Sequence, residues 1–186
     1  MDTIAYYRNV LAQHGATYRG MDCGSAASHA ARLRVLASMV QRYDETVLDV
    51  GCGVGHLIDY STKIRKEHYR GIDRVPEMIA TSRTRRPTWQ FEVGDILQPN
   101  PEWAADYVLA SGLFQFPSPW RNMMQAMFSL CRKGMACNFL RSGDVPESIA
   151  HPEEVLTEAL AMTPWVTLRA DYLPNDFTVF LYKEQP

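Results

Sequence analysis

Val47-Leu48-Asp49-Val50-Gly51-Cys52-Gly53-Val54-Gly55 is the stretch that decides the fold of this 186-residue chain. An apolar run is interrupted by one acid, and three glycines follow at alternate positions. The pattern predicts a buried strand that feeds a tight turn before a helix. Glycine lets such a turn adopt positive φ and lets a ligand approach the main chain closely. Because the next helix presents free N–H groups, we expect a small polar ligand at this strand end.

Two phosphate-binding turns compete for this pattern, and neither fits. The dinucleotide turn G-x-G-x-x-G needs a small third residue. His56 holds that position here, and the third glycine comes one residue early, at Gly55. The P-loop also fails, because no Gly-Lys-Ser/Thr follows the turn.

The segment D-V-G-C-G-V-G at residues 49–55 instead resembles the first motif of the class I S-adenosylmethionine-dependent methyltransferases, of the small bacterial, small-molecule type. The resemblance implies S-adenosylmethionine as cofactor and S-adenosylhomocysteine as product. It also implies cofactor contacts from Asp49, Gly51, Cys52, Gly53 and Gly55.

Length and composition agree with one compact enzyme domain over residues 1–186. The resemblance implies that it has an N-terminal helical cap or lid (1–45) and a cofactor-binding core (46–186). The net charge is −2, so nucleic acid is not an expected partner. No apolar run suits a membrane span, and no signal peptide is expected. The four cysteines lack metal-ligand spacing and are too few for a disulfide framework. We expect a cytoplasmic protein without a metal, and a homodimer stays open.

Strands and helices are expected to alternate along the chain. Helices are predicted at about 3–13, 25–41 with Ser25 as N-cap, 55–66, 76–83, 119–131 and 152–162. Strands are predicted at 46–50, 68–72, 89–93, 106–110, 135–140, 165–172 and 177–182, the last two joined by a turn at 173–176.

This alternation favours an α/β fold with right-handed crossovers. The closing hairpin predicts an antiparallel last strand. The expected fold is therefore Rossmann-like and doubly wound, with a mainly parallel seven-stranded sheet, as the resembling family also implies. Its ligand belongs at the carboxyl ends of the strands.

Two further acids end predicted strands. Asp73 lies 22 residues after Gly51, where an acid can accept both hydroxyls of a ribose; NAD would use the same contact, and a helix-capping role before Pro76 stays open. The resemblance places Asp95 beside the adenine amine, with Ile96 flanking the ring, although a turn-forming aspartate is the alternative. Arg74 and Gly94 adjoin these positions and join the expected cofactor site.

The fourth strand is followed by Ser111-Gly112-Leu113-Phe114. Family members that methylate nucleobase amines or glutamine amides often carry Asn/Asp-Pro-Pro-Tyr/Phe here, so its absence argues against those substrates. The resemblance brings Ser111 and Gly112 to the methionine end of the cofactor. Leu113 and Phe114 would wall the reacting methyl group or simply pack in the core.

The N-terminal segment is expected to cover the cofactor and to help form the substrate pocket. Tyr6, Tyr7 and Tyr18 offer aromatic faces that attract a sulfonium, and a hydrophobic docking stripe is the alternative. Arg32 would pair with the cofactor carboxylate or lie in solvent. For a general base the candidates are weak ones: His14, Asp22 and His29.

The expected function is methyl transfer from S-adenosylmethionine to an O, N or C atom of a small molecule, by in-line displacement that depends mainly on positioning. Three alternatives stay open: aminocarboxypropyl transfer or cyclisation of the same cofactor, methylation of RNA or protein, and cofactor binding without catalysis. A basic run at Arg65, Lys66, Arg70, Arg83, Arg85 and Arg86 is the support for an RNA partner. The sequence does not identify the acceptor.

Overall fold

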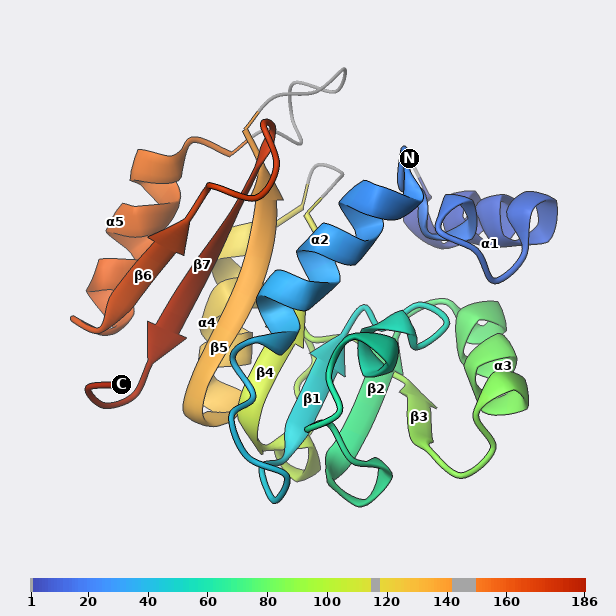
Figure 1. Cartoon of the computed structure of the whole chain (residues 1–186), viewed down its shortest axis with the longest axis horizontal. Coiled ribbons are helices and arrows are strands. Elements are labelled where there is room, and N and C mark those ends of the chain that lie inside the picture. Colours follow the sequence, from blue (N-terminus) through green and yellow to red (C-terminus); the bar gives the residue numbers. More distant parts are fainter. Residues whose placement is uncertain (1, 115–117, 142–149) are drawn as a thin grey trace.

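The computed structural model describes residues 2–114, 118–141 and 150–186. Seven strands form one sheet in the order β3-β2-β1-β4-β5-β7-β6, and helices cover both of its faces (Figure 1). β7 pairs antiparallel with both of its neighbours, whereas the other neighbouring strands pair parallel. The predicted Rossmann-like fold with an antiparallel last strand is confirmed.

The elements follow one another in the predicted alternation. The strands are β1 (Val47–Val50), β2 (Tyr69–Asp73), β3 (Gln90–Val93), β4 (Ala105–Ala110), β5 (Cys131–Leu140), β6 (Val166–Arg169) and β7 (Asp176–Tyr182). The α-helices are α1 (Thr3–His14), α2 (Ala26–Ala37), α3 (Pro76–Arg85), α4 (Trp120–Leu130) and α5 (Pro152–Met162), and short 3₁₀ turns are η1 (Arg19–Met21), η2 (His56–Tyr60), η3 (Lys66–His68) and η4 (Pro101–Trp103).

Helices α4 and α5 bury one face of the sheet. The α4 residues Met123, Met124, Met127 and Leu130 recur at helical spacing and join a large apolar cluster with the strands. On the opposite face, Leu33 and Leu36 of α2 belong to a second cluster that contains β1, β4 and β5 residues. Figure 1 shows α2 crossing this face of the sheet.

The predicted helix at 55–66 is wrong. The chain forms only the 3₁₀ turn η2, and Ser61 then leaves helical geometry. The Ser61 hydroxyl accepts a hydrogen bond from the Lys63 backbone N–H at 3.2 Å, so the side chain competes with helical bonding. The buried residues Leu57 and Ile58 are adjacent and do not continue as an apolar stripe.

Some other boundaries also differ from the predictions. Helix α2 ends at Ala37 instead of near Gln41, and the Ser38 hydroxyl there donates to the Val35 carbonyl at 2.6 Å. Strand β5 begins at Cys131, directly after α4, and β6 is shorter than predicted. The Ser25 cap is confirmed, since its hydroxyl accepts from the Ser28 N–H.

The N-terminal segment packs over the glycine turn and α3. Leu11 of α1 shares a buried cluster with Val54, Val75 and Met78. Figure 1 shows α1 beside α3, at the end of the sheet where β1 and β2 terminate. The first two helices therefore reach the predicted ligand site from outside the sheet.

If the buried face of α2 anchors this helix to the sheet, substituting a buried leucine of α2 should lower the free energy of unfolding more than substituting an exposed leucine elsewhere. Leu36 is 0% exposed and Leu160 of α5 is 51% exposed. Leu36→Ala should lower the free energy of unfolding by about 2–5 kcal/mol because it removes buried apolar contacts and leaves a cavity. Leu160→Ala, the matched control in another helix, should cost less than about 1 kcal/mol. Urea denaturation of both variants tests this, and equal losses would contradict the packing of α2.

Candidate functional site

The glycine turn follows β1 at the point where the order of the strands reverses. β1 lies between β2 and β4, so the connections leave the two sides of β1 and open a crevice at the carboxyl ends. Gly51, Gly53 and Gly55 all have positive φ. A Cβ on Gly53 would lie 2.5 Å from Met21 Sδ and one on Gly51 would lie 3.0 Å from a Leu113 methyl carbon. The turn is therefore built for close approach to its backbone.

Asp73 at the end of β2 holds the glycine turn. One carboxylate oxygen accepts from the Gly53 N–H and the other from the Val75 N–H, both at 2.9 Å. Burial raises the pKa of Asp73, and the two backbone N–H groups oppose that shift. Each oxygen keeps a further lone pair, so the carboxylate can still accept a ligand hydroxyl.

Asp49 lies within β1 and is buried. The Tyr69 hydroxyl donates to it at 2.7 Å. Burial raises the pKa of Asp49 to about 7, against the effect of the Tyr69 hydrogen bond. Its charge near neutral pH therefore depends on what occupies the adjacent space.

A cavity of about 220 Å³ lies over these strand ends. The structure places many predicted site residues in its lining: Tyr7, His29, Arg32, Asp49, Gly51, Cys52, Gly53, Asp73, Arg74, Gly94, Ile96, Ser111, Gly112 and Leu113. Residues from the cap, from strands β1 and β2 and from the segments after β3 and β4 thus meet in one space.

Several predicted residues lie elsewhere. Phe114 stacks on Phe139 in the core with ring centroids 4.5 Å apart, which agrees with the alternative of core packing, and it is outside the lining of the cavity. Gly55 starts η2, and a Cβ there would contact the Phe91 ring. Asp95 is outside the cavity lining, accepts from the Leu97 N–H at 3.0 Å and pairs with Arg74 at 3.2 Å.

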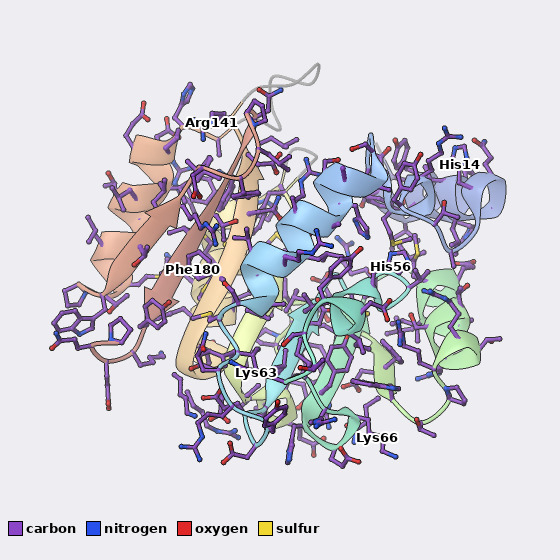
Figure 2. All side chains as sticks on the ribbon, viewed as in Figure 1. His14, His56, Lys63, Lys66, Arg141 and Phe180 are labelled. Atoms are coloured by element: carbon purple, nitrogen blue, oxygen red, sulfur yellow. The ribbon has the colours of Figure 1, made fainter. Side chains whose placement is uncertain are left out.

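The other cap residues that the sequence predicted also fall outside the lining of the cavity: Tyr6, His14, Tyr18 and Asp22. The Tyr6 hydroxyl donates to Asp22 at 3.0 Å, and the Arg19 guanidinium lies over the Tyr18 ring. His14 is exposed at the end of α1. Figure 2 shows His14 far out on this helix and His56 near the centre of the molecule. Of the three candidate bases, only His29 lines the cavity.

Arg32 has a partner that the sequence did not reveal. Its guanidinium makes two hydrogen bonds to Asp176 of β7, at 2.6 and 2.9 Å. Arg32 is 9% exposed and Asp176 is 2% exposed. Burial disfavours the guanidinium charge, but the hydrogen bonds and charge of Asp176 raise the pKa of Arg32. The sequence predicted that Arg32 pairs with the cofactor carboxylate or lies in solvent. The structure instead pairs it with the carboxylate of Asp176.

The pair extends to the end of β4. The buried Asn138 amide donates to Asp176 at 3.1 Å, and its oxygen accepts from the Gly112 N–H at 2.8 Å. Ordered side chains therefore connect α2 with the predicted cofactor-contacting Gly112.

A second polar cluster lies on the cap side of the cavity. His29 Nδ1 is 3.2 Å from Cys23 Sγ, and His29 Nε2 is 2.9 Å from His56 Nδ1. Burial, helped by the neighbouring His56 and Arg32, lowers the pKa of His29 to about 4. Burial also lowers the pKa of His56 and raises the pKa of the Cys23 thiol. All three groups are therefore uncharged at neutral pH.

Sequence reasoning missed His56, Cys23 and Met21 as lining residues. In the sequence, His56 was used only to exclude the dinucleotide-binding turn. Its position directly after the glycine turn could have identified it as a residue of the ligand site. Cys23 and Met21 carry no motif, because their positions depend on how the cap folds back.

Each residue of the basic run contacts another group of the protein. Arg65 lies over the Tyr43 ring, Lys66 pairs with Glu67, and Arg70 donates to the Glu102 carbonyl. Arg83 donates to the Phe91 carbonyl, Arg85 donates to the Val54 carbonyl, and Arg86 pairs with Asp59. Within the described residues, no cluster of three or more His, Cys, Asp or Glu is placed to hold a metal ion. No helix in those ranges has the length and apolar character for crossing a membrane.

Comparison with known proteins agrees with this site. Residues 47–134, from β1 to β5, match the protein family described as methyltransferase domain. This match, together with the relatives and solved structures described next, supports a class I S-adenosylmethionine-dependent methyltransferase.

Relatives of this chain include a trans-aconitate 2-methyltransferase of Methylobacterium radiotolerans, 24% identical over 74% of this chain and 52% of the relative. One from Escherichia coli is 34% identical over 45% of this chain and 34% of the relative. The chain spans about half the length of the relatives it matches.

Solved structures share its fold. The N-methyltransferase NodS from Bradyrhizobium japonicum, in complex with S-adenosylhomocysteine, has a TM-score of 0.72 at 16% identity and covers 98% of both chains. A magnesium protoporphyrin IX methyltransferase from Synechocystis with bound S-adenosylhomocysteine has a TM-score of 0.70 at 12% identity, over 98% of this chain and 94% of that one.

The residues of the cavity fit S-adenosylmethionine, the cofactor of the matched family. Side chains at Gly51 and Gly53 would fill the space over the turn, and the Asp73 carboxylate lines the same space. Apolar Ile96 and Met78 line it beyond Asp73, which suits a purine ring.

The buried pair between α2 and β7 predicts unequal effects of two aspartate substitutions. Asp176→Ala should destabilise the protein by about 3–5 kcal/mol, because it leaves the Arg32 charge buried without its partner. Asp171→Ala removes an exposed partner of Arg169 and should leave the free energy of unfolding nearly unchanged. Chemical denaturation of both variants measures the difference, and an undestabilised Asp176→Ala would show that the pair does not anchor α2.

Proposed function

We propose that this chain binds S-adenosylmethionine in the cavity over the strand ends and transfers its methyl group to a small-molecule acceptor. The supporting observation is the shared lining of the cavity, in which the glycine turn and Asp73 lie opposite side chains from the cap. Cofactor-binding groups come from the sheet, and acceptor-binding groups come from the cap.

The proposed cofactor contacts follow the strand ends. Asp73 would accept the ribose hydroxyls, because each of its oxygens has a lone pair left. Ile96 would flank the adenine, and Asp95, held by Arg74, would accept from the adenine amine at the edge of the cavity. Gly51 and Gly53 would contact the methionine portion together with Ser111 and Gly112.

The bound cofactor supplies a methyl group on a sulfonium that is already a good leaving group. The protein therefore acts mainly by positioning, which can be worth effective molarities of about 10⁵–10⁸ M. Leu113 and Met123 line the cavity from the side of β4 and α4, and Tyr7 and Met21 line it from the cap. These apolar groups would exclude water, the competing nucleophile.

The cap supports a small acceptor, because it limits the space that is open to an acceptor. Residues of α1, η1 and α2 line the cavity and cover it, which leaves a confined space. Four free cysteines further fit a reducing compartment such as the cytoplasm. The relatives named trans-aconitate 2-methyltransferase make trans-aconitate the first acceptor to assay.

The cofactor site predicts a difference between two glycines with positive φ. An Ala at Gly53 would place a Cβ in the space over the turn, whereas a Cβ at Gly15 meets nothing within 4 Å. Both substitutions strain the backbone by about 1–2 kcal/mol. Gly53→Ala should weaken S-adenosylhomocysteine binding by about tenfold or more, a loss of about 1.4 kcal/mol or more, and Gly15→Ala should leave it unchanged. Isothermal titration calorimetry measures the affinity of each variant for S-adenosylhomocysteine. Equal affinities of the two variants would show that the turn is not part of the cofactor site.

The reaction class predicts where a labelled methyl group goes. With S-adenosylmethionine labelled in its methyl group, the protein should label a metabolite fraction free of macromolecules and release S-adenosylhomocysteine. The Asp73→Ala variant, which lacks the proposed partner of the ribose hydroxyls, should transfer little label to the metabolite fraction. Label in an RNA or protein fraction would contradict the small-molecule acceptor. Methylthioadenosine as the product would point to transfer of the aminocarboxypropyl group.

A further inference from the structure

The charged groups of the cavity leave little to attract an anion. Two arginines line it among the described residues, and each has an acidic partner: Arg32 pairs with Asp176, and Arg74 pairs with Asp95. The carboxylates of Asp49 and Asp73 line the same space. An acceptor with several carboxylates would meet no unpaired cation among the described lining residues. It would lose its hydration without gaining an ion pair in return. The lining favours an uncharged acceptor.

The two histidines on the cap side share one hydrogen bond. Burial lowers the pKa of both rings and keeps them uncharged, so each ring carries hydrogen on one nitrogen only. His56 Nδ1 faces His29 Nε2 at 2.9 Å, so one of these two nitrogens donates and the other accepts. In the relay proposed below, His29 Nε2 is the donor and His56 Nδ1 is the acceptor.

The cluster continues to Cys23. With the ring hydrogen on His29 Nε2, His29 Nδ1 is a bare acceptor. It lies 3.2 Å from Cys23 Sγ, closer than the Met21 carbonyl at 3.5 Å. Arg32 Nη1, the guanidinium nitrogen without a bond to Asp176, donates to the same sulfur at 3.7 Å. With that tautomer of His29 the thiol can donate to His29 Nδ1 as well as to the Met21 carbonyl, and Cys23, His29 and Arg32 all line the cavity.

We propose that the acceptor is an uncharged molecule with a hydroxyl or thiol at the methylated atom, and that Cys23 and His29 take up the proton it loses. This inference rests on the proposed methyl transfer. As the bond between the acceptor atom and the methyl carbon forms, the carbon–sulfonium bond breaks and its electron pair stays on the cofactor sulfur. The acceptor proton passes to Cys23 Sγ, while the Cys23 proton passes to His29 Nδ1. His56 Nδ1 is placed to receive the proton from His29 Nε2.

A weak base is sufficient for this step. A hydroxyl or thiol becomes strongly acidic once its atom shares a lone pair with the methyl carbon, so the proton leaves late. A neutral imidazole accepts at that stage, and burial keeps His29 neutral. A carboxylate acceptor has no proton to lose, and the relay would be idle with it.

The direction of the hydrogen bonds can be read without any acceptor. In ¹⁵N-histidine-labelled protein at pH 7, long-range ¹H–¹⁵N spectra should show His29 and His56 with hydrogen on Nε2 alone. His14, which is exposed at the end of α1, gives the reference for a solvent-facing ring in the same sample. A His29 ring that carries its hydrogen on Nδ1 would overturn the relay, whether or not the protein transfers methyl groups.

Turnover tests the acceptor class. Neutral phenols, alcohols and thiols are compared with trans-aconitate, with S-adenosylhomocysteine formation as the readout. Wild-type protein should methylate a neutral acceptor, and His29→Gln should lower kcat by about 10²-fold with unchanged S-adenosylhomocysteine affinity. Cys23→Ser, which keeps a hydrogen-bearing donor, should retain more activity than Cys23→Ala.

Matched controls separate the relay from general damage. His14→Gln changes an exposed histidine, and Cys131→Ser changes a buried cysteine whose thiol donates to the Phe128 carbonyl outside the cavity. Both should keep wild-type turnover. Preferred methylation of trans-aconitate, or unaltered kcat in His29→Gln, would overturn the inference and leave methyl transfer standing. Absent binding of S-adenosylhomocysteine by wild type would instead refute the proposed function.

Discussion

The buried pair of Arg32 and Asp176 joins parts of the chain that are 144 residues apart. A buried carboxylate and a buried guanidinium are each costly unless they meet with good geometry. Their two hydrogen bonds meet that requirement and fix α2 against the first residue of β7. Asn138 then carries the connection to the Gly112 backbone, so one polar network sets the distance between the cap and the carboxyl end of β4.

Everything on the cap side of the cavity depends on that placement. Once α2 is fixed, His29 and Arg32 face the crevice, and Cys23, two residues before the Ser25 helix cap, meets both of them. The η2 turn brings His56 to the same place, because the chain leaves the glycine turn in a 3₁₀ conformation. A full helix from residue 55, as the sequence pattern predicted, would have carried the following residues along a different path.

The cofactor side could be predicted well because its signals are local. A glycine with positive φ, an acid at a strand end and an apolar run each leave a mark within a few residues. Asp73, Gly51 and Gly53 therefore line one cavity, and their contacts with the cofactor stay a prediction. The partners of Arg32, the stacking of Phe114 on Phe139 and the Cys23–His29–His56 cluster each join distant segments. No single-sequence pattern records such pairs, since Asp176 looked like one more turn residue before the last strand.

This division between local and distant determinants bears on what a methyltransferase motif can say about its acceptor. In the proposed site the turn and Asp73 would recognise groups that every S-adenosylmethionine molecule has, so relatives with different acceptors can share them. The cap would meet the acceptor, and its side chains are placed by long-range contacts, which no local motif encodes. Here Asp176 and Asp95 pair with the two arginines that line the cavity. Under the proposed function, this charge pairing around the cavity, more than the glycine motif, would decide which small molecule can be methylated.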